Sequence, residues 1–247
     1  MAQFRKDRHE YLPDSKTLFE VVMLADQYGN RIGPANPSGV AGSSFGRARG
    51  SQPFTLFDSF NRYEDNAKFC TANTSTATYS FDANSASVSL TVDTTSGAKV
   101  QRETTRVFAY QPGKSLLIIN TFVMNAPQAN LAQRIGYFND LNGIFLEQTG
   151  TTIRFGIKSN VTGSVVYEYA NQADWNIDTL LGAVSSSPSQ KTLDLTKAQI
   201  FWSDIEWLGV GSVRCGFVID GQLIHCHTFH HANLITSTYM TTACLPV

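Results

Sequence analysis

Charged residues are scarce in this chain, and long apolar runs are missing. Asp, Glu, Lys and Arg make up 16% of the 247 residues, and the formal net charge is −1. Such weak and balanced charge predicts no electrostatic attraction to nucleic acid. No run approaches the roughly 20 apolar residues of a membrane-spanning helix, so we expect no membrane span. The N-terminal stretch MAQFRKDRHEYLPDSK lacks the apolar segment of a secretory signal, so we expect folding in a cytosol.

Cysteine and the common catalytic motifs are also sparse. The four cysteines, Cys70, Cys215, Cys226 and Cys244, are too few for a disulfide framework in so long a chain. No Cys-x-x-Cys spacing favours zinc, and the sequence has neither a phosphate-binding glycine loop nor a nucleophile–base motif. We therefore expect no metal, no cofactor and no enzymatic activity.

Segments with β-strand character fill the chain from Pro53 onward. Ser, Thr, Asn, Gln and Gly dominate the polar positions, and short alternating segments end at turns such as Ser96-Gly97, Pro112-Gly113, Asn142-Gly143 and Thr149-Gly150. This pattern predicts an all-β protein in which residues 51–247 form a two-sheet antiparallel jelly-roll sandwich. The segment 172–181, with Asp174 as a helix-cap candidate, is interpreted as a surface excursion.

The first 50 residues have a different composition. Residues 28–52 are crowded with Gly, Pro, Ser and Asn, whereas residues 17–25 favour one short strand or helix. So long an irregular segment is either a flexible linker or a binding arm. Because 50 residues hold too little core to stand alone, we favour an irregular, extended arm over residues 1–50 that docks on a neighbouring subunit.

Residues 199–233 predict three antiparallel strands. Asp220-Gly221 suits a two-residue type I′ turn, which sets Cys215 opposite Cys226. A turn around residues 209–211 sets Glu206 opposite Arg214. Side chains alternate between the two faces of a strand. The apolar face then holds Phe201, Ile205, Trp207, Val213, Cys215, Phe217, Ile219, Ile224 and Cys226. The polar face holds Trp202, Asp204, Glu206, Arg214, Gly216, His225 and His227.

The opposed cysteines have two interpretations. Cross-strand Cα atoms lie about 5.5 Å apart, which is within disulfide range, so a Cys215–Cys226 disulfide is one candidate. A reducing cytosol favours the other, two buried thiols.

The polar face allows a glycan-binding groove, a glycosidase site or a wet surface of paired charges. Residues 202–209, WSDIEWLG, resemble the active-site strand of retaining β-glucanases, which are concanavalin A-like jelly rolls. The resemblance gives Asp204 the middle position of the Glu-x-Asp-x-Glu pattern and Glu206 the acid/base position. Trp202 falls at the nucleophile, where it cannot form the glycosyl ester that a retaining mechanism needs. The resemblance therefore implies the fold without the chemistry.

Each of these residues also has a purely structural interpretation. Glu206 opposite Arg214 is most simply a cross-strand ion pair. His225 and His227 supply two potential ligands but no third, so we expect no metal. His230 and His231 follow the strand and suit hydrogen bonds to loop backbone. Trp207 is predicted to lie in the core; Trp175 is predicted to anchor a loop.

A resemblance extends over most of the chain. The motifs FGRARG, QPFTLFDSF, RETTRVFAYQPGKSL, IGYFNDLNGIFLEQTG, LDLTKAQIFWSDIEWLGVGSVRCGFVIDGQLI and HANLITSTYMTTACLPV resemble a virion structural protein family of marine tailed bacteriophages, cyanophages especially. The resemblance spans roughly residues 28–247. It implies a subunit of the tail, baseplate, neck or head fibre, assembled in the host bacterial cytoplasm with other virion proteins and copies of itself.

Three functional classes follow, in this order. The first is a virion structural subunit that docks through its N-terminal arm. The second is a host-receptor module that binds surface polysaccharide through Trp202, Asp204, Glu206, Arg214, His225 and His227. The third and most remote is a glycoside hydrolase, which would need a second carboxylate near Glu206.

Overall fold

The computed structural model describes residues 9–10, 19–20, 54–65, 67–74 and 76–247. The chain divides into two compact units, Met1–Ser51 and Gln52–Val247. In the first unit, β1 (His9–Glu10) pairs antiparallel with β2 (Phe19–Glu20). The rest of the arm predicted over residues 1–50 lies outside the described residues.

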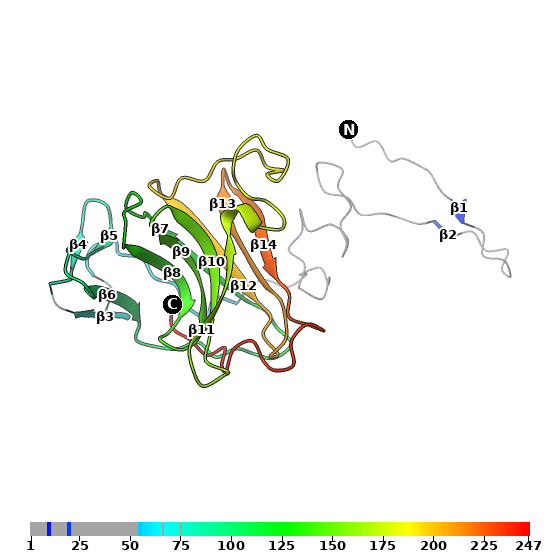
Figure 1. The fold of residues 1–247 in the computed structure, drawn as a ribbon, viewed down its shortest axis with the longest axis horizontal. Coiled ribbons are helices and arrows are strands. Elements are labelled where there is room, and N and C mark those ends of the chain that lie inside the picture. Colours follow the sequence, from blue (N-terminus) through cyan, green and yellow to red (C-terminus); the bar gives the residue numbers. More distant parts are fainter. Residues whose placement is uncertain (1–8, 11–18, 21–53, 66, 75) are drawn as a thin grey trace. The chain divides into compact units, whose positions relative to one another are not determined.

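Two four-stranded antiparallel sheets form the body of the second unit (Figure 1). In spatial order the first sheet contains β11 (Val166–Asn171), β10 (Thr152–Ser159), β9 (Gly143–Thr149) and β8 (Ala132–Phe138). The second contains β14 (Gln222–Phe229), β13 (Val213–Ile219), β12 (Gln199–Ile205) and β7 (Leu116–Phe122). The prediction of an all-β, antiparallel chain is confirmed.

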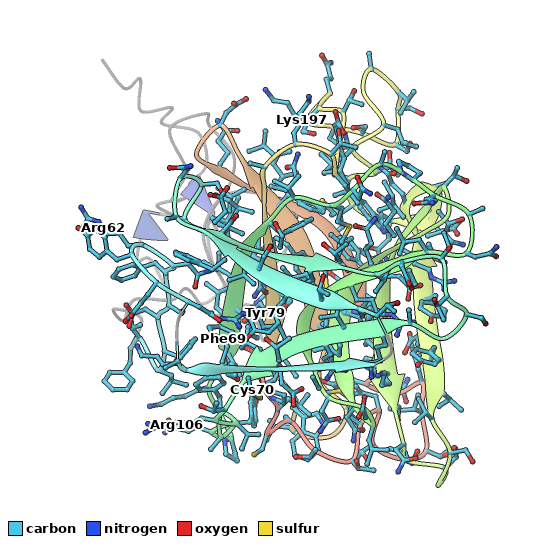
Figure 2. All side chains as sticks on the ribbon, turned by 90° about the vertical axis from the view of Figure 1, so that its left-hand side faces the viewer. Arg62, Phe69, Cys70, Tyr79, Arg106 and Lys197 are labelled. Carbon is cyan, nitrogen blue, oxygen red and sulfur yellow. The ribbon has the colours of Figure 1, made fainter. Side chains whose placement is uncertain are left out.

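Two smaller strand pairs precede these sheets. They are β3 (Phe69–Thr74) with β6 (Lys99–Thr104), and β4 (Thr78–Asp82) with β5 (Ser87–Thr91). Figure 2 views the unit from their side, with Phe69, Cys70 and Tyr79 labelled. The helical content of the described residues is one 3₁₀ turn, η1 (Gln172–Asp174). None of the helical structure described is long and apolar enough to cross a membrane.

The inner faces of the two sheets share one aromatic core. Phe155 of β10 is fully buried and stacks on Trp175, with ring centroids 4.2 Å apart. Its ring also lies 5.7 Å from Phe201 of β12 and 6.1 Å from Phe217 of β13. Burial of such rings contributes most of the apolar area in a core of this kind. The apolar residues that alternate along these strands are therefore the ones that face this core.

One buried hydroxyl helps to hold the C-terminal segment against the first sheet. Tyr137 of β8 is fully buried, and its Oη lies 2.7 Å from the Ala243 carbonyl oxygen. The same atom accepts a hydrogen bond from the Leu245 amide at 2.9 Å. Burial raises the pKa of Tyr137 well above its usual range, so the hydroxyl stays protonated and able to donate.

Two local predictions are wrong for identifiable reasons. The turn predicted at Asn142-Gly143 lies earlier, because Phe138 pairs with Gly143 and residues 139–142 form the loop. Asn139 Oδ1 accepts from the amides of Leu141 and Asn142 at 2.9 and 2.8 Å, which closes that loop as an Asx turn. Asp174 caps no helix, since the N-cap residue of η1 is Asn171 and it makes no side-chain capping bond.

The segment predicted as a surface excursion is instead largely packed into the unit. Trp175, Asp178 and Leu180 are 4%, 3% and 0% exposed. Asp178 organises the loop, because its Oδ1 accepts from the Leu180 amide at 2.9 Å and its Oδ2 from the Ser189 amide at 2.9 Å. A polar sequence hides this burial, since the carboxylate is satisfied by local backbone donors.

Replacing Phe155 by Ala tests the shared core. The substitution leaves a cavity between Trp175, Phe201 and Phe217, so we expect the free energy of unfolding to fall by about 3–5 kcal/mol. Val107, a loop residue that is 62% exposed, supplies the control. Urea unfolding should show less than about 0.5 kcal/mol change for Val107→Ala. Equal losses in the two variants would contradict the described core.

Candidate functional site

The β13–β14 hairpin has the predicted turn. Asp220 and Gly221 have φ values of 52° and 74°, as a type I′ turn requires. Ile219 pairs with Gln222, and Phe217 pairs with Ile224. The strands of this hairpin therefore begin in the predicted register.

The predicted register of β12 on β13 is wrong by two residues. Asp204, not Glu206, lies opposite Arg214, and Ile205 lies opposite Val213. A wider loop causes the shift, because the Gly211 amide donates to the Trp207 carbonyl at 2.8 Å and closes the chain there. A two-residue shift keeps every side chain on its predicted face. The faces were thus predicted correctly although the pairs were not.

A β-bulge at Cys226 changes the positions of the histidines. Gly216 pairs with His225, but Cys215 pairs with His227, so one residue of β14 is extra. His227 therefore turns to the apolar face, where its ring lies 4.5 Å from that of Phe229. The prediction that His225 and His227 share a face is wrong. The prediction that Cys226 lies directly opposite Cys215 fails for the same reason.

The polar face is buried at its centre. Trp202, Asp204 and Glu206 are 5%, 4% and 3% exposed. The Trp202 ring lies over Gly216, where an added Cβ would come within 2.7 Å of it, and its Nε1 donates to the Phe217 carbonyl at 3.2 Å. A sugar ring needs an open aromatic surface, which this tryptophan does not offer. The glycan-binding role predicted for this face is therefore not supported by its geometry.

Asp204 and Glu206, the carboxylates of this face, contact other groups of the fold. Asp204 Oδ2 accepts from Arg214 Nη2 at 2.6 Å, an ion pair between largely buried side chains. Glu206 begins the loop that joins β12 to β13, and its amide donates to the Ser212 carbonyl at 3.3 Å. Burial and the nearby charges of Glu206 and Asp204 raise the pKa of Tyr110. The partly buried Trp207 ring packs edge-on against Tyr110, 6.2 Å away.

Both strand histidines are held neutral by burial. Desolvation lowers the pKa of His225 to about 4, and the positive charge of Arg214 adds to the shift. Desolvation also lowers the pKa of His227 to about 4. His225 Nε2 lies 2.9 Å from Thr228 Oγ1, and His227 Nδ1 accepts from the Asn176 amide at 3.3 Å. Both imidazole rings therefore form hydrogen bonds within the packed structure.

Neither a disulfide nor a metal cluster is found in the described part of the chain. Cys215 and Cys226 are free and buried, and burial raises the pKa of both thiols. Cys70 and Cys244 are free and exposed. Among residues 54–65, 67–74 and 76–247, no group of three His, Cys, Asp or Glu side chains is placed to hold a metal ion.

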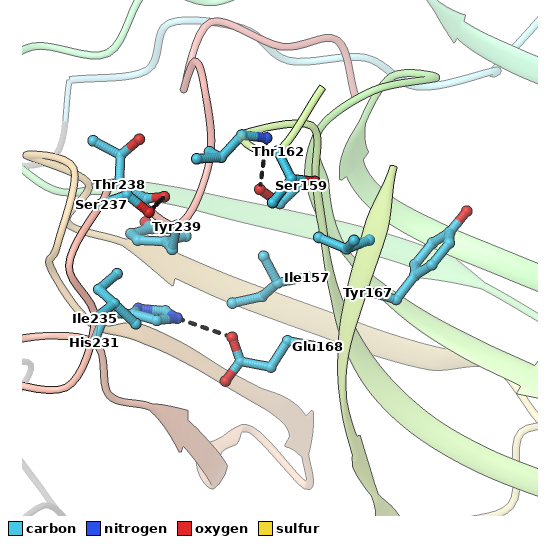
Figure 3. A pocket seen from close by; sticks show the side chains of 12 residues that line it. Ile157, Ser159, Thr162, Tyr167, Glu168, His231, Ile235, Ser237, Thr238 and Tyr239 are labelled. Carbon is cyan, nitrogen blue, oxygen red and sulfur yellow. Dashed lines mark hydrogen bonds and ion pairs between the residues drawn. The ribbon is translucent and has the colours of Figure 1, made fainter. Parts of the chain in front are cut away.

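A pocket that the sequence did not reveal lies between β11 and the C-terminal segment (Figure 3). Its volume is about 220 Å³, and its lining includes Glu168, His231 and Tyr239. His231 Nδ1 lies 2.9 Å from the Gly211 carbonyl, and Nε2 lies 3.1 Å from Glu168 Oε2. Because a carbonyl oxygen only accepts, Nδ1 carries a proton. The imidazole stacks on Tyr239 with centroids 4.1 Å apart.

The pocket combines one acidic group with apolar walls. Glu168 is half exposed, whereas the His231 ring is almost wholly buried. The prediction that His231 bonds loop backbone matches its contact with Gly211. Glu168 was not singled out, because one glutamate on an edge strand gives no motif. The Glu168–His231 contact therefore joins β11 to the segment that follows β14, and the Glu168 carboxylate stays half exposed.

A second polar cluster was also missed, on the outer face of the first sheet. Glu147 of β9 is fully buried, yet it forms ion pairs with Arg134 of β8 and Arg154 of β10. Sequence reasoning named none of these three residues as part of a site. The available signal was their cross-strand alignment, since Arg134 and Arg154 both pair with Glu147 in register.

Comparisons with protein-family models, curated proteins and solved structures give no match to this chain.

The buried histidines predict that the fold weakens in mild acid. Unfolded histidine has a pKa of about 6.5, whereas the folded value is about 4 for both rings. Their stabilising effect is complete above pH 6.5 and is lost as the pH falls towards 4. At pH 5 we expect a loss of about 2 kcal/mol per histidine in the free energy of unfolding relative to pH 7.5.

Urea unfolding at both pH values measures this loss. His225→Gln should remove about half of the difference, because one of the two depressed groups is gone. His230 is exposed and is the matched control, so His230→Gln should leave the difference unchanged. A wild-type stability equal at pH 5 and 7.5 would contradict the burial of both rings.

The thiols predict a simple labelling pattern. A thiol reagent such as DTNB should react quickly with Cys70 and Cys244 in the native protein. Unfolding in urea without reductant should expose Cys215 and Cys226 and double the number of reactive thiols, because neither forms a disulfide. An unchanged number after unfolding would indicate a Cys215–Cys226 bridge.

Proposed function

We propose that this chain is a structural subunit of a tailed-phage virion that assembles with other virion proteins and with copies of itself. One observation carries the proposal. In the first described segment of the second unit, residues 54–65, Phe54, Phe60 and Tyr63 are 85%, 69% and 78% exposed. Soluble monomers seldom expose many large apolar groups together, whereas subunits cover them with a neighbour.

The position of this segment supports an assembly role. It follows the unit Met1–Ser51 directly and contains no strand among its described residues. In this proposal the arm, residues 1–50, and the apolar segment 54–65 dock together on the next subunit. The two sheets remain outside the contact. Closed symmetry makes copies of the same chain the simplest partners. The resemblance over roughly residues 28–247 supports a virion as the assembly and the host cytoplasm as its place of formation.

A concanavalin A-like jelly roll belongs to the same proposal. Two four-stranded antiparallel sheets around one aromatic core support it. Hydrolysis is the weakest alternative, because Asp204 is paired with Arg214 and Trp202 stands at the nucleophile position. We therefore propose a non-enzymatic subunit, and the burial of Trp202 argues against glycan binding at that face.

Removal of the exposed rings tests the assembly role. We expect the full chain to form oligomers at micromolar concentration, measured by light scattering after size exclusion. Phe60→Ser combined with Tyr63→Ser should shift it to monomer, because each change removes apolar area from the contact. Tyr79, which is 47% exposed on β4, is the matched control (Figure 2), and Tyr79→Ser should leave the mass unchanged.

Mass spectrometry of purified particles tests the virion itself. The chain should be present at a fixed ratio to the other particle proteins. A monomeric wild type that is also absent from particles would contradict the proposal.

A further inference from the structure

The outer face of the first sheet gathers aromatic and cationic side chains in register. Tyr167 lies opposite Lys158 and Tyr169 opposite Gly156, while Arg154 lies opposite Glu147. Neighbours paired in register point to the same face. Figure 3 shows Tyr167 on the opposite side of β11 from Glu168, which lines the pocket. Tyr167 is nonetheless among the residues that line that pocket, so the face adjoins the pocket at β11. It belongs to the first sheet and is distinct from the Trp202 face of the second.

Positive charge predominates on this face. Arg134, Arg154 and Lys158 oppose one carboxylate, Glu147, so the balance is +3 − 1 = +2. Glu147 is fully buried between the two arginines, which fixes where both guanidinium groups lie. Lys158 is 5% exposed and donates to the Asn139 carbonyl at 2.9 Å, so it adds charge from a largely buried position.

The Arg134 guanidinium has hydrogen-bond donors that Glu147 does not occupy. Its Nε binds Glu147, and its two terminal nitrogens have no hydrogen-bond partner in the described part of the chain. The side chain is 32% exposed. A guanidinium held by a buried carboxylate and open at its far end matches a carboxylate or sulfate ester of a ligand. The pre-set position reduces the entropy lost when such a group binds.

The tyrosines supply a platform beside this charge. The Tyr167 and Tyr169 rings are nearly parallel, at 3° with centroids 5.3 Å apart, and Tyr167 is 41% exposed. The Arg154 guanidinium lies 3.6 Å from the centroid of Tyr169 and holds that ring in place. Both phenol hydroxyls lack hydrogen-bond partners within residues 54–65, 67–74 and 76–247. An aromatic surface with open hydroxyls suits the C–H face and hydroxyls of a sugar ring.

We infer that this face, formed by Arg134, Arg154, Tyr167 and Tyr169, binds an acidic polysaccharide. The guanidinium groups contact its anionic substituents, and the tyrosines contact its sugar rings. An acidic peptide would use the charge but not the stacking surface, so the paired rings favour a polysaccharide. The inference does not depend on the virion proposal, because it concerns only the first sheet.

Binding of the full chain to alginate, a chain of uronic acids, tests the inference. Biolayer interferometry at low salt should show binding to alginate and none to neutral dextran, with affinity falling as salt rises. Arg134→Gln should weaken binding about tenfold through loss of a charge-assisted hydrogen bond. Glu147 stays paired with Arg154 in that variant, so the fold should hold. Arg106→Gln removes an equal charge from an exposed position (Figure 2) and should leave affinity unchanged.

A second pair of variants tests the contribution of the tyrosine rings. Tyr167→Ala should weaken alginate binding about fivefold or more, because the stacking surface is lost. Tyr79→Ala removes a similarly exposed ring from β4 and should have no effect. Thermal melts establish that all four variants are folded.

Several outcomes would overturn the inference. They are absence of alginate binding at low salt, equal binding to dextran, and equal losses in Arg134→Gln and Arg106→Gln. Equal binding to polyglutamate with no effect of Tyr167→Ala would instead assign the face to acidic peptides. Equal binding to single-stranded DNA would assign it to polyanions in general.

Discussion

Phe155 is the side chain on which the rest of the second unit depends. It comes from β10 in the first sheet, yet its ring contacts Trp175 from the following loop and lies close to Phe201 and Phe217 of the second sheet. Two sheets share a core only where large side chains from both fill the space between them. The outward positions of β9 and β10 follow from this constraint, since alternation then sends Glu147 and Arg154 to the opposite face.

Alternation is also what made much of the fold predictable. The apolar residues of β10 and β13 recur with a period of two, and Asp220-Gly221 fixes a hairpin of known geometry. No comparable sequence pattern fixes the length of a loop or the position of a bulge. The loop after Glu206 is wider than its glycines indicate, and Cys226 is extra in β14, a strand that itself contains no glycine or proline. Pairs across strands were therefore less predictable than faces.

The burial of a polar face could not be predicted from the pattern of one strand. Trp202, Asp204 and Arg214 alternate like residues of a wet surface, and their side chains do share one face. A tryptophan over Gly216 and an ion pair at 2.6 Å nevertheless satisfy the polar groups within the structure. Alternation gives the face of a side chain, whereas exposure depends on what else the fold brings to that face. Exposure was therefore the property of this face that the sequence did not predict.

The two sheets differ in how they use their arginines. Arg214 binds Asp204, so the charge of each side chain is neutralised by the other. Arg134 and Arg154 share a single carboxylate, Glu147, and the buried acid cannot neutralise both. Burying one carboxylate under two guanidinium groups is favourable for the acid, because each adds hydrogen bonds that offset its desolvation. The excess positive charge then stays at the surface. The same ion pairs that stabilise the first sheet thereby leave it with an anion-attracting face, whereas Asp204 and Arg214 neutralise each other on the second.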